Sequence, residues 1–138
     1  MGILRNFLGI LNSLTGISTR HNRVLRDANE WVINVQRFLT TYNLYGSPDF
    51  DSLFKNIGEA KFDLTVIVHR ARPLITSTKD IKGKQVSPLI VELNDSFEHL
   101  RRALINPSLH GGTLSEVMPK LRISFEKLQD ALSDIEYI

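Results

Sequence analysis

The segment from Val24 to Tyr42 constrains the fold more than any other part of the sequence. Its apolar residues recur at spacings of three and four, which places them on one stripe of an α-helix. The stripe includes Trp31, the only tryptophan of the chain, and polar residues such as Glu30 and Arg37 face away from it. A helix of this kind must bury its apolar stripe against other helices. The segment therefore predicts a domain built from several packed helices.

Three further segments have the same spacing of apolar residues. Together with the first they give helices expected at about 20–44, 48–75, 88–105 and 114–137. Ser47-Pro48 and Ser87-Pro88 are typical helix starts, because serine caps free N–H groups and proline lacks the N–H that would be unpaired there. Most connections are short, which favours antiparallel neighbours. We therefore expect an all-α protein in which residues 17–138 form one domain, an antiparallel four-helix bundle.

The expected helix at 48–75 has a wider apolar surface than the others. Phe62 and Val66 fall outside its main stripe, so we expect this helix to be the most central one. Pro73 lies near its end and lacks the backbone N–H that would bond to the preceding turn. We expect Pro73 to end or kink the helix.

A short amphipathic segment, residues 1–16, precedes the expected bundle. Its apolar side chains share one face of a helix over residues 3–14, which is too short to be stable alone in water. The face consists of Ile3, Leu4, Phe7, Leu8, Leu11 and Leu14. We expect this face to lie on its own bundle, on a partner protein or neighbouring subunit, or on a membrane surface.

The composition excludes several classes of protein. The chain has 138 residues, enough for one domain with a substantial core, and it has no cysteine. Disulfides, thiolate metal sites and cysteine nucleophiles are therefore excluded. No apolar run approaches the roughly 18 residues that a transmembrane helix needs. We expect an intracellular protein that is cytoplasmic or peripheral at a membrane.

Charge is distributed unevenly along the chain, although the formal net charge is only +2. Residues 1–46 carry five basic and two acidic side chains, whereas residues 112–138 carry three basic and five acidic ones. These regions could match each other within the fold or pair head to tail between subunits. The pattern is not the uniformly basic one of many nucleic-acid-binding domains.

The sequence contains no pattern that predicts catalysis or metal binding. Metal sites in helical bundles commonly use Glu-x-x-His, and no histidine of this chain follows a glutamate by three residues. Asp95 and His99 are one turn apart but lie opposite the apolar stripe of their helix, so we expect them at the surface. A glycine-rich phosphate loop is also absent. We therefore expect no enzyme activity, no metal and no cofactor.

Two groups of basic residues could form an anion-binding patch if the fold brings them together. They are Arg20, Arg23, Arg26, Arg70, Arg72, Lys79, Lys82 and Lys84. Such a patch would bind phosphate groups in a salt-dependent manner without reading sequence. The simpler interpretation is that these residues occupy solvated helix ends and loops.

These observations favour a non-enzymatic interaction or assembly module. In this hypothesis the apolar N-terminal helix mediates self-association, docking to a partner protein or contact with a membrane surface. The alternative is a small basic helical subunit that binds nucleic-acid backbone non-specifically within a larger complex. We expect a homo- or hetero-oligomer in either case.

Overall fold

The structure, a computed structural model, describes residues 17–46, 50–81, 85–106 and 114–138. Helices dominate these ranges, which contain no strand. They are α2 (Ile17–Thr41), α3 (Asp51–Lys55), α4 (Ile57–Ser77), α5 (Val86–Ile105) and α7 (Leu114–Ser133), with the 3₁₀ turn η1 (Thr78–Asp80) after α4. The fold is therefore all-helical. Residues 3–14 and Ser47-Pro48 lie outside the described residues.

Helix α2 ends earlier than the sequence predicted, at Thr41 rather than near residue 44. The N–H of Leu44 donates to the carbonyl of Leu39 at 2.8 Å, and the N–H of Asn43 donates to that of Thr40 at 3.3 Å. Asn43 has a φ of 53°, in the left-handed region. This pair of bonds is a Schellman motif, which caps the free carbonyls of a helix end. Asn43 takes the left-handed position that ends the helix, ahead of Gly46.

The single helix predicted over 48–75 is divided into α3 and α4. Asn56 separates them with non-helical dihedral angles, φ −120° and ψ 40°. Its side-chain amide donates to the carbonyl of Ser52, while its own carbonyl accepts the N–H of Ala60 at 2.9 Å. Asparagine competes for backbone groups in this way and therefore interrupts helices readily.

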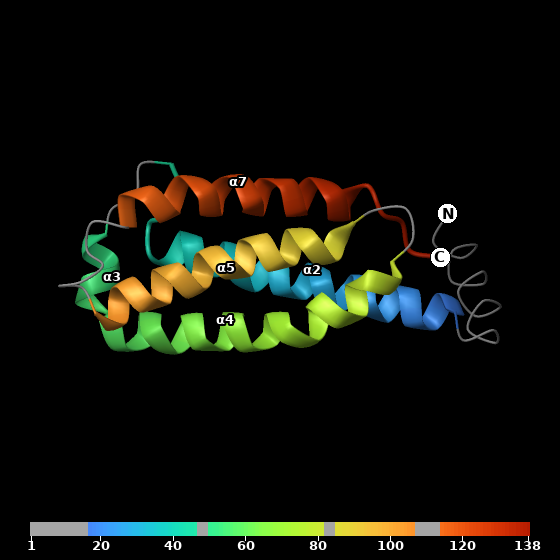
Figure 1. Ribbon diagram of the computed structural model, residues 1–138, viewed down its shortest axis with the longest axis horizontal. Coiled ribbons are helices and arrows are strands. Elements are labelled where there is room, and N and C mark those ends of the chain that lie inside the picture. Colours follow the sequence, from blue (N-terminus) through green and yellow to red (C-terminus); the bar gives the residue numbers. More distant parts are fainter. Residues whose placement is uncertain (1–16, 47–49, 82–84, 107–113) are drawn as a thin grey trace.

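Pro73 lies inside α4 and does not end it. The helix continues to Ser77, and its last part leaves the line of the preceding turns (Figure 1). The Thr78 hydroxyl donates to the carbonyl of Leu74 at 2.6 Å, and the Ser87 hydroxyl donates to that of Ile75 at 2.6 Å. The Leu74 carbonyl also accepts the backbone N–H of Thr78, so these side-chain bonds add to the backbone bonds at the end of α4. Ser87 was expected to cap its own helix, but it binds the end of α4 instead.

Helix α7 ends at Ser133, although its heptad-like pattern predicted a helix to residue 137. The last residues form an extended tail along the start of α2. The Asn22 amide donates to the carbonyl of Ile138 at 2.9 Å and its carbonyl oxygen accepts the N–H of Ile138 at 2.8 Å. The His21 ring lies 3.0 Å from the carbonyl of Glu136. These side chains supply the tail with hydrogen bonds that a further helical turn would otherwise make.

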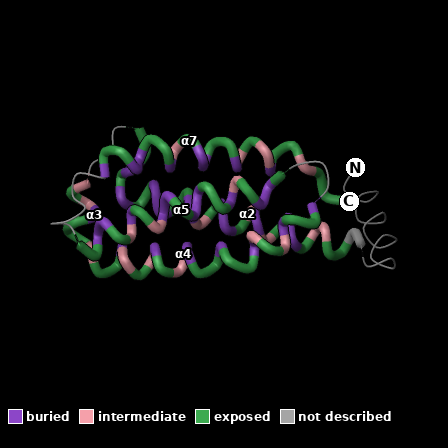
Figure 2. The backbone as a smooth tube through the Cα atoms, in the orientation of Figure 1, coloured by how far each residue is buried: buried purple, intermediate pink, exposed green. Residues whose placement is uncertain are grey.

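The four long helices lie side by side, and each packs mainly against two others (Figure 1). Helix α2 packs against α4 and α7, and α5 packs against the same two helices. The colours of Figure 1 show that consecutive long helices run in opposite directions. The short helix α3 contacts the beginning of α4 at one end. The apolar stripes of all four long helices face the space between them (Figure 2).

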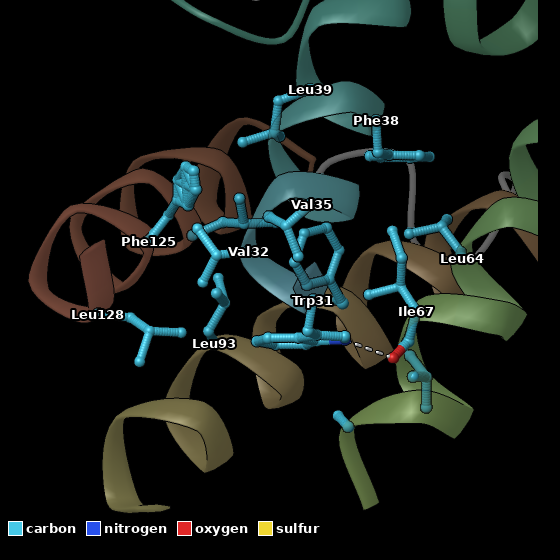
Figure 3. Close-up of a cluster of buried hydrophobic side chains, with 14 of the residues drawn as sticks. Trp31, Val32, Val35, Phe38, Leu39, Leu64, Ile67, Leu93, Phe125 and Leu128 are labelled. Carbon is cyan, nitrogen blue, oxygen red and sulfur yellow. Dashed lines mark hydrogen bonds between the residues drawn. The ribbon is translucent and has the colours of Figure 1, made fainter. Parts of the chain in front are cut away.

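Trp31 is one of the largest buried side chains of this core, with 2% of its surface exposed. Its Nε1–H donates to the carbonyl of Ile67 in α4 at 3.0 Å (Figure 3). Leu93 of α5 and Phe125 of α7 belong to the same buried cluster (Figure 3). A buried indole needs such an acceptor, because an unpaired N–H in an apolar environment is costly.

The structure contradicts the expectation that the helix containing Phe62 is the most central. Phe62 is 68% exposed and Val66 is only partly buried, so the wide apolar arc of α4 extends onto the outer surface. Helix α5 buries more positions than α4, including Ser87, Asn94 and Ser96. The apolar residues of a helix did not predict how many of its positions are buried, because polar residues are buried in α5 and apolar ones are exposed in α4.

We predict that Trp31→Ala lowers the free energy of unfolding by about 3–5 kcal/mol, because it removes a large buried ring and leaves a cavity. Urea denaturation followed by circular dichroism measures the change. Ile33→Ala is the matched control, since Ile33 lies on the same helix and is 52% exposed. Its effect should stay within about 0.5 kcal/mol. A loss as small for Trp31→Ala as for Ile33→Ala would contradict this description of the core.

Candidate functional site

A groove of about 590 Å³ between α2 and the end of α4 brings together part of the predicted anion patch. Arg20 and Arg23 of α2 and Arg70 of α4 line it, and its floor includes Trp31 and Leu74. Asp27 and Glu30 line the same groove. Three cations and two carboxylates therefore share the surface. The groove is suited to a ligand with both charges more than to a polyanion.

Arg20 is already paired within the chain. Its guanidinium lies 2.6 Å from the carboxylate of Asp80 in η1, and both side chains are more than half exposed. The pair ties the start of α2 to the turn after α4. An exposed pair of this kind contributes little to stability, typically below ~1 kcal/mol. Arg23 and Arg70 remain as the cations that face the groove.

The other predicted members of the patch lie elsewhere. Arg26 lines a second hollow that Arg23 and Tyr137 also line, and its guanidinium lies 3.5 Å from the Asp27 carboxylate. Arg72 is exposed on α4 outside the groove, and Lys79 lines a hollow between η1 and the start of α5. Lys82 and Lys84 lie outside the described residues. Three of the eight residues thus line the groove and three others lie outside it, although Arg26 shares a neighbouring hollow with Arg23.

A second groove, of about 500 Å³, runs between α5 and α7. Asp95 and His99, which were considered as a ligand pair, are exposed and line it together with Glu92 and Glu116. The Ser124 hydroxyl donates to the Glu92 carboxylate at 3.1 Å, and the ammonium of Lys127 lies 3.7 Å from it. Within the described ranges, no three His, Asp or Glu side chains are grouped closely enough to hold a metal ion.

The pair formed by Tyr42 and Asp63 is an interaction that the sequence reasoning missed. Tyr42 follows α2, is 2% exposed and donates its hydroxyl to the Asp63 carboxylate of α4 at 2.9 Å. Burial raises the pKa of Tyr42 to about 12, and the hydrogen bond and negative charge of Asp63 add to the shift. The only signal in the sequence was a tyrosine at the end of an apolar stripe.

Buried polar side chains in the described helices serve packing. Thr78 and Ser87 bond to carbonyls at the end of α4, and Ser124 bonds to Glu92. Asn94 of α5 is buried, and its carboxamide oxygen has no hydrogen-bond partner among the described residues.

The chain matches no model of a known protein family, no curated protein and no solved structure. Within the described part of the chain, no helix has the length and apolar character needed to cross a membrane.

The Tyr42–Asp63 pair predicts a specific loss of stability at high pH. The unfolded tyrosine ionises near pH 10 and the folded one near pH 12, so between these values ionisation favours the unfolded state. The free energy of unfolding should fall by roughly 2 kcal/mol over this window through this group. Urea denaturation from pH 8 to 12 should show a shallower fall for Tyr42→Phe.

Asp63→Asn is the companion variant. It removes the negative charge but leaves Tyr42 buried, so it should retain part of the alkaline effect, since burial is the larger cause. If the unfolding free energy of Tyr42→Phe followed that of the unmodified chain from pH 10 to 12, the raised pKa would be wrong.

Proposed function

We propose that the chain is a non-enzymatic interaction module whose described helices form an antiparallel four-helix scaffold. The scaffold presents the apolar segment 3–14 to a partner protein or a membrane surface. Support for the four-helix arrangement comes from the closed set of contacts in which α2 and α5 each touch both α4 and α7. Closed rings of four helices with short connections are typical of such bundles.

The observation that carries the proposal is that the described helices complete a core among themselves. Large side chains from all four long helices, such as Trp31, Leu64, Phe97 and Phe125, are almost fully buried. The proposal assigns the six apolar side chains of residues 3–14 to a contact outside this core. An apolar face of that kind is stabilised by burial against protein or lipid.

The character of the described surface supports a role in binding and not in catalysis. Its grooves are open, and two of the charged groups within them lie beside opposite charges, Arg20 with Asp80 and Glu92 with Lys127. The buried ionisable pair, Tyr42 with Asp63, is not among the residues that line these grooves.

Removal of residues 1–16 tests the proposal. The shortened chain should keep its helical circular-dichroism spectrum, because the large side chains of the four long helices bury one another. It should lose either flotation with phosphatidylcholine–phosphatidylserine vesicles or co-purification in a defined complex, whichever the full chain shows. A matched variant of the full chain, Phe7→Ser with Leu11→Ser, should show the same loss. Unchanged behaviour in both assays would contradict the role of residues 3–14.

A second candidate function is non-specific binding of nucleic-acid backbone. The observation in its favour is that Arg20, Arg23 and Arg70 line one groove. Asp27 and Glu30 in the same groove oppose it, and the separation of Arg26, Arg72 and Lys79 reduces the continuous basic surface.

Reversing the charge of one arginine in the groove tests whether the chain binds nucleic-acid backbone there. If the groove holds phosphate groups, Arg23→Glu should weaken binding to generic RNA or DNA about tenfold at low salt. Arg37→Glu is the matched control, because Arg37 is an exposed arginine of the same helix outside the groove. Equal losses for both variants would indicate a general charge effect, and binding that does not respond to salt would exclude the function.

A further inference from the structure

We propose that the tail formed by residues 134–138 is a releasable latch on the first turns of α2, and that this latch controls the reach of the segment that precedes the helix. The tail is distinct from residues 3–14, so the latch itself goes beyond the proposed function. Its effect on the contact assigned to residues 3–14 rests on that function. Three observations carry the inference: hydrogen bonds that hold the tail by its backbone, the exposure of these bonds, and the scarcity of other ties at the start of α2.

Two neighbouring side chains of α2 hold the tail by its backbone. The carboxamide of Asn22 donates to the carbonyl oxygen of Ile138 at 2.9 Å and accepts the N–H of the same residue at 2.8 Å. Nε2 of His21 lies 3.0 Å from the carbonyl oxygen of Glu136. Residues 136 and 138 are two apart, so their backbone groups face the same side of an extended segment. The tail therefore lies along α2 in a fixed register, because one side chain matches both polar backbone groups of one residue.

The tail crosses the seam between α2 and α7, which is the least extensive contact between neighbouring long helices. The end of α7 and the start of α2 lie at the same end of the molecule (Figure 1). Ile135 anchors the tail there, since its side chain packs against the core and its N–H donates to the carbonyl of Leu132 at 3.1 Å. Toward the other end of the seam, Arg122 of α7 donates to the carbonyl of Gly46 at 2.7 Å. The seam thus has a polar tie toward each end, and the tail supplies the tie at the start of α2.

Few other interactions of the described chain hold the start of α2. No side chain from Thr19 to Arg23 is buried, and the next residue, Val24, is the one that enters the core. Arg20 pairs with Asp80, but both side chains are more than half exposed, and exposed ion pairs contribute little to stability. The bonds to the tail are therefore the main tie between these first turns and the rest of the chain.

The latch can open without disturbing the core. Its three bonds lie at the surface, and Tyr137 and Ile138 are 41% and 46% exposed. Tyr137 lines a hollow together with Arg23 and Arg26, and its ring is not buried there. Water can replace bonds of this kind, so such segments open locally at a far smaller free-energy cost than a buried helix.

Opening of the latch lengthens the reach of residues 1–16, which connect directly to Ile17 at the beginning of α2. The seven residues 17–23 extend over about 10 Å as a helix and over about 24 Å when unwound. An open latch therefore adds roughly 14 Å to the distance over which the preceding segment can contact a partner or a membrane surface. A contact that needs this reach favours the open latch, and an open latch favours the contact by the same factor.

Hydrogen–deuterium exchange of the full chain, read by mass spectrometry, tests the latch. Asn22→Ala removes both bonds to residue 138. Amide exchange should become about fivefold faster in peptides that cover residues 17–25 and in peptides that cover the tail, while exchange in α4 and α5 stays unchanged. Alanine favours a helix more than asparagine does, so the change in helix propensity alone would slow exchange in α2. Faster exchange therefore reports the loss of the tie.

Asn29→Ala is the matched control, because Asn29 lies on the same helix and donates to the carbonyl of Leu25 within α2. It should leave exchange at residues 17–25 within about twofold of the unmodified rate. Ile138→Pro is a second variant that leaves the sequence of α2 unaltered, since it removes the N–H that Asn22 accepts. It should also speed exchange at the start of α2. A chain that lacks residues 134–138 should show the full increase, and Asn22→Ala should add nothing to it.

Binding by the full chain tests the effect of the latch on residues 3–14. Asn22→Ala should strengthen flotation with phosphatidylcholine–phosphatidylserine vesicles or association in a defined complex, whichever the full chain shows, by about threefold. Asn29→Ala should leave the same binding unchanged.

Several results would overturn the inference. They are exchange at the start of α2 that Asn22→Ala leaves unchanged or slows, equal effects of Asn22→Ala and Asn29→Ala, and an added effect of Asn22→Ala in the chain that lacks residues 134–138. Faster exchange with unchanged binding would overturn the control of residues 3–14 by the latch. If the full chain neither floats with vesicles nor enters a complex, the function proposed for residues 3–14 fails, and the exchange rates still decide whether the tail is a latch.

Discussion

The fold depends on the mutual burial of four apolar stripes around Trp31. No single helix of this length is stable by itself in water, so each is held by the faces of its neighbours. The bond from the indole N–H to the carbonyl of Ile67 adds a directional constraint, because it is satisfied at only one position of α2 along α4. Apolar burial brings the helices together, and this bond helps to select their relative position.

The spacing of apolar residues was sufficient to predict the all-helical class and the inward face of α2. Val24, Ala28, Trp31, Val35 and Tyr42 of the predicted stripe are all buried. The spacing of apolar residues did not predict where the helices end. Asn43, Asn56 and Asn22 decide where segments stop or attach, and each does so through hydrogen bonds to particular backbone groups. A sequence shows that asparagine can make such bonds but not which partner will be within reach.

The same limit applies to the candidate sites. The sequence identified the basic residues, but whether arginines form a patch depends on the helix face and on nearby carboxylates. Arg23 and Arg70 meet because α2 and α4 are neighbours, whereas Arg72, two residues from Arg70, points to another side. The guanidinium of Arg20 forms an ion pair with Asp80, which is sixty residues away in the chain. Contacts of this kind follow from the tertiary arrangement and have no local signal.

The width of the apolar arc on α4 was the least reliable guide. Each of the four long helices packs mainly against two others, so only about half of its circumference can be buried within the described chain. Phe62 lies beyond that half, while Ser96 and Asn94 of α5 lie within theirs. Helix position therefore decides burial, and an apolar residue outside the buried half remains in water. Burying an exposed phenylalanine contributes about 1.5–3 kcal/mol. Phe62, on which the wrong prediction about the core was based, is therefore also the residue that a contact from outside the helix pair would stabilise most.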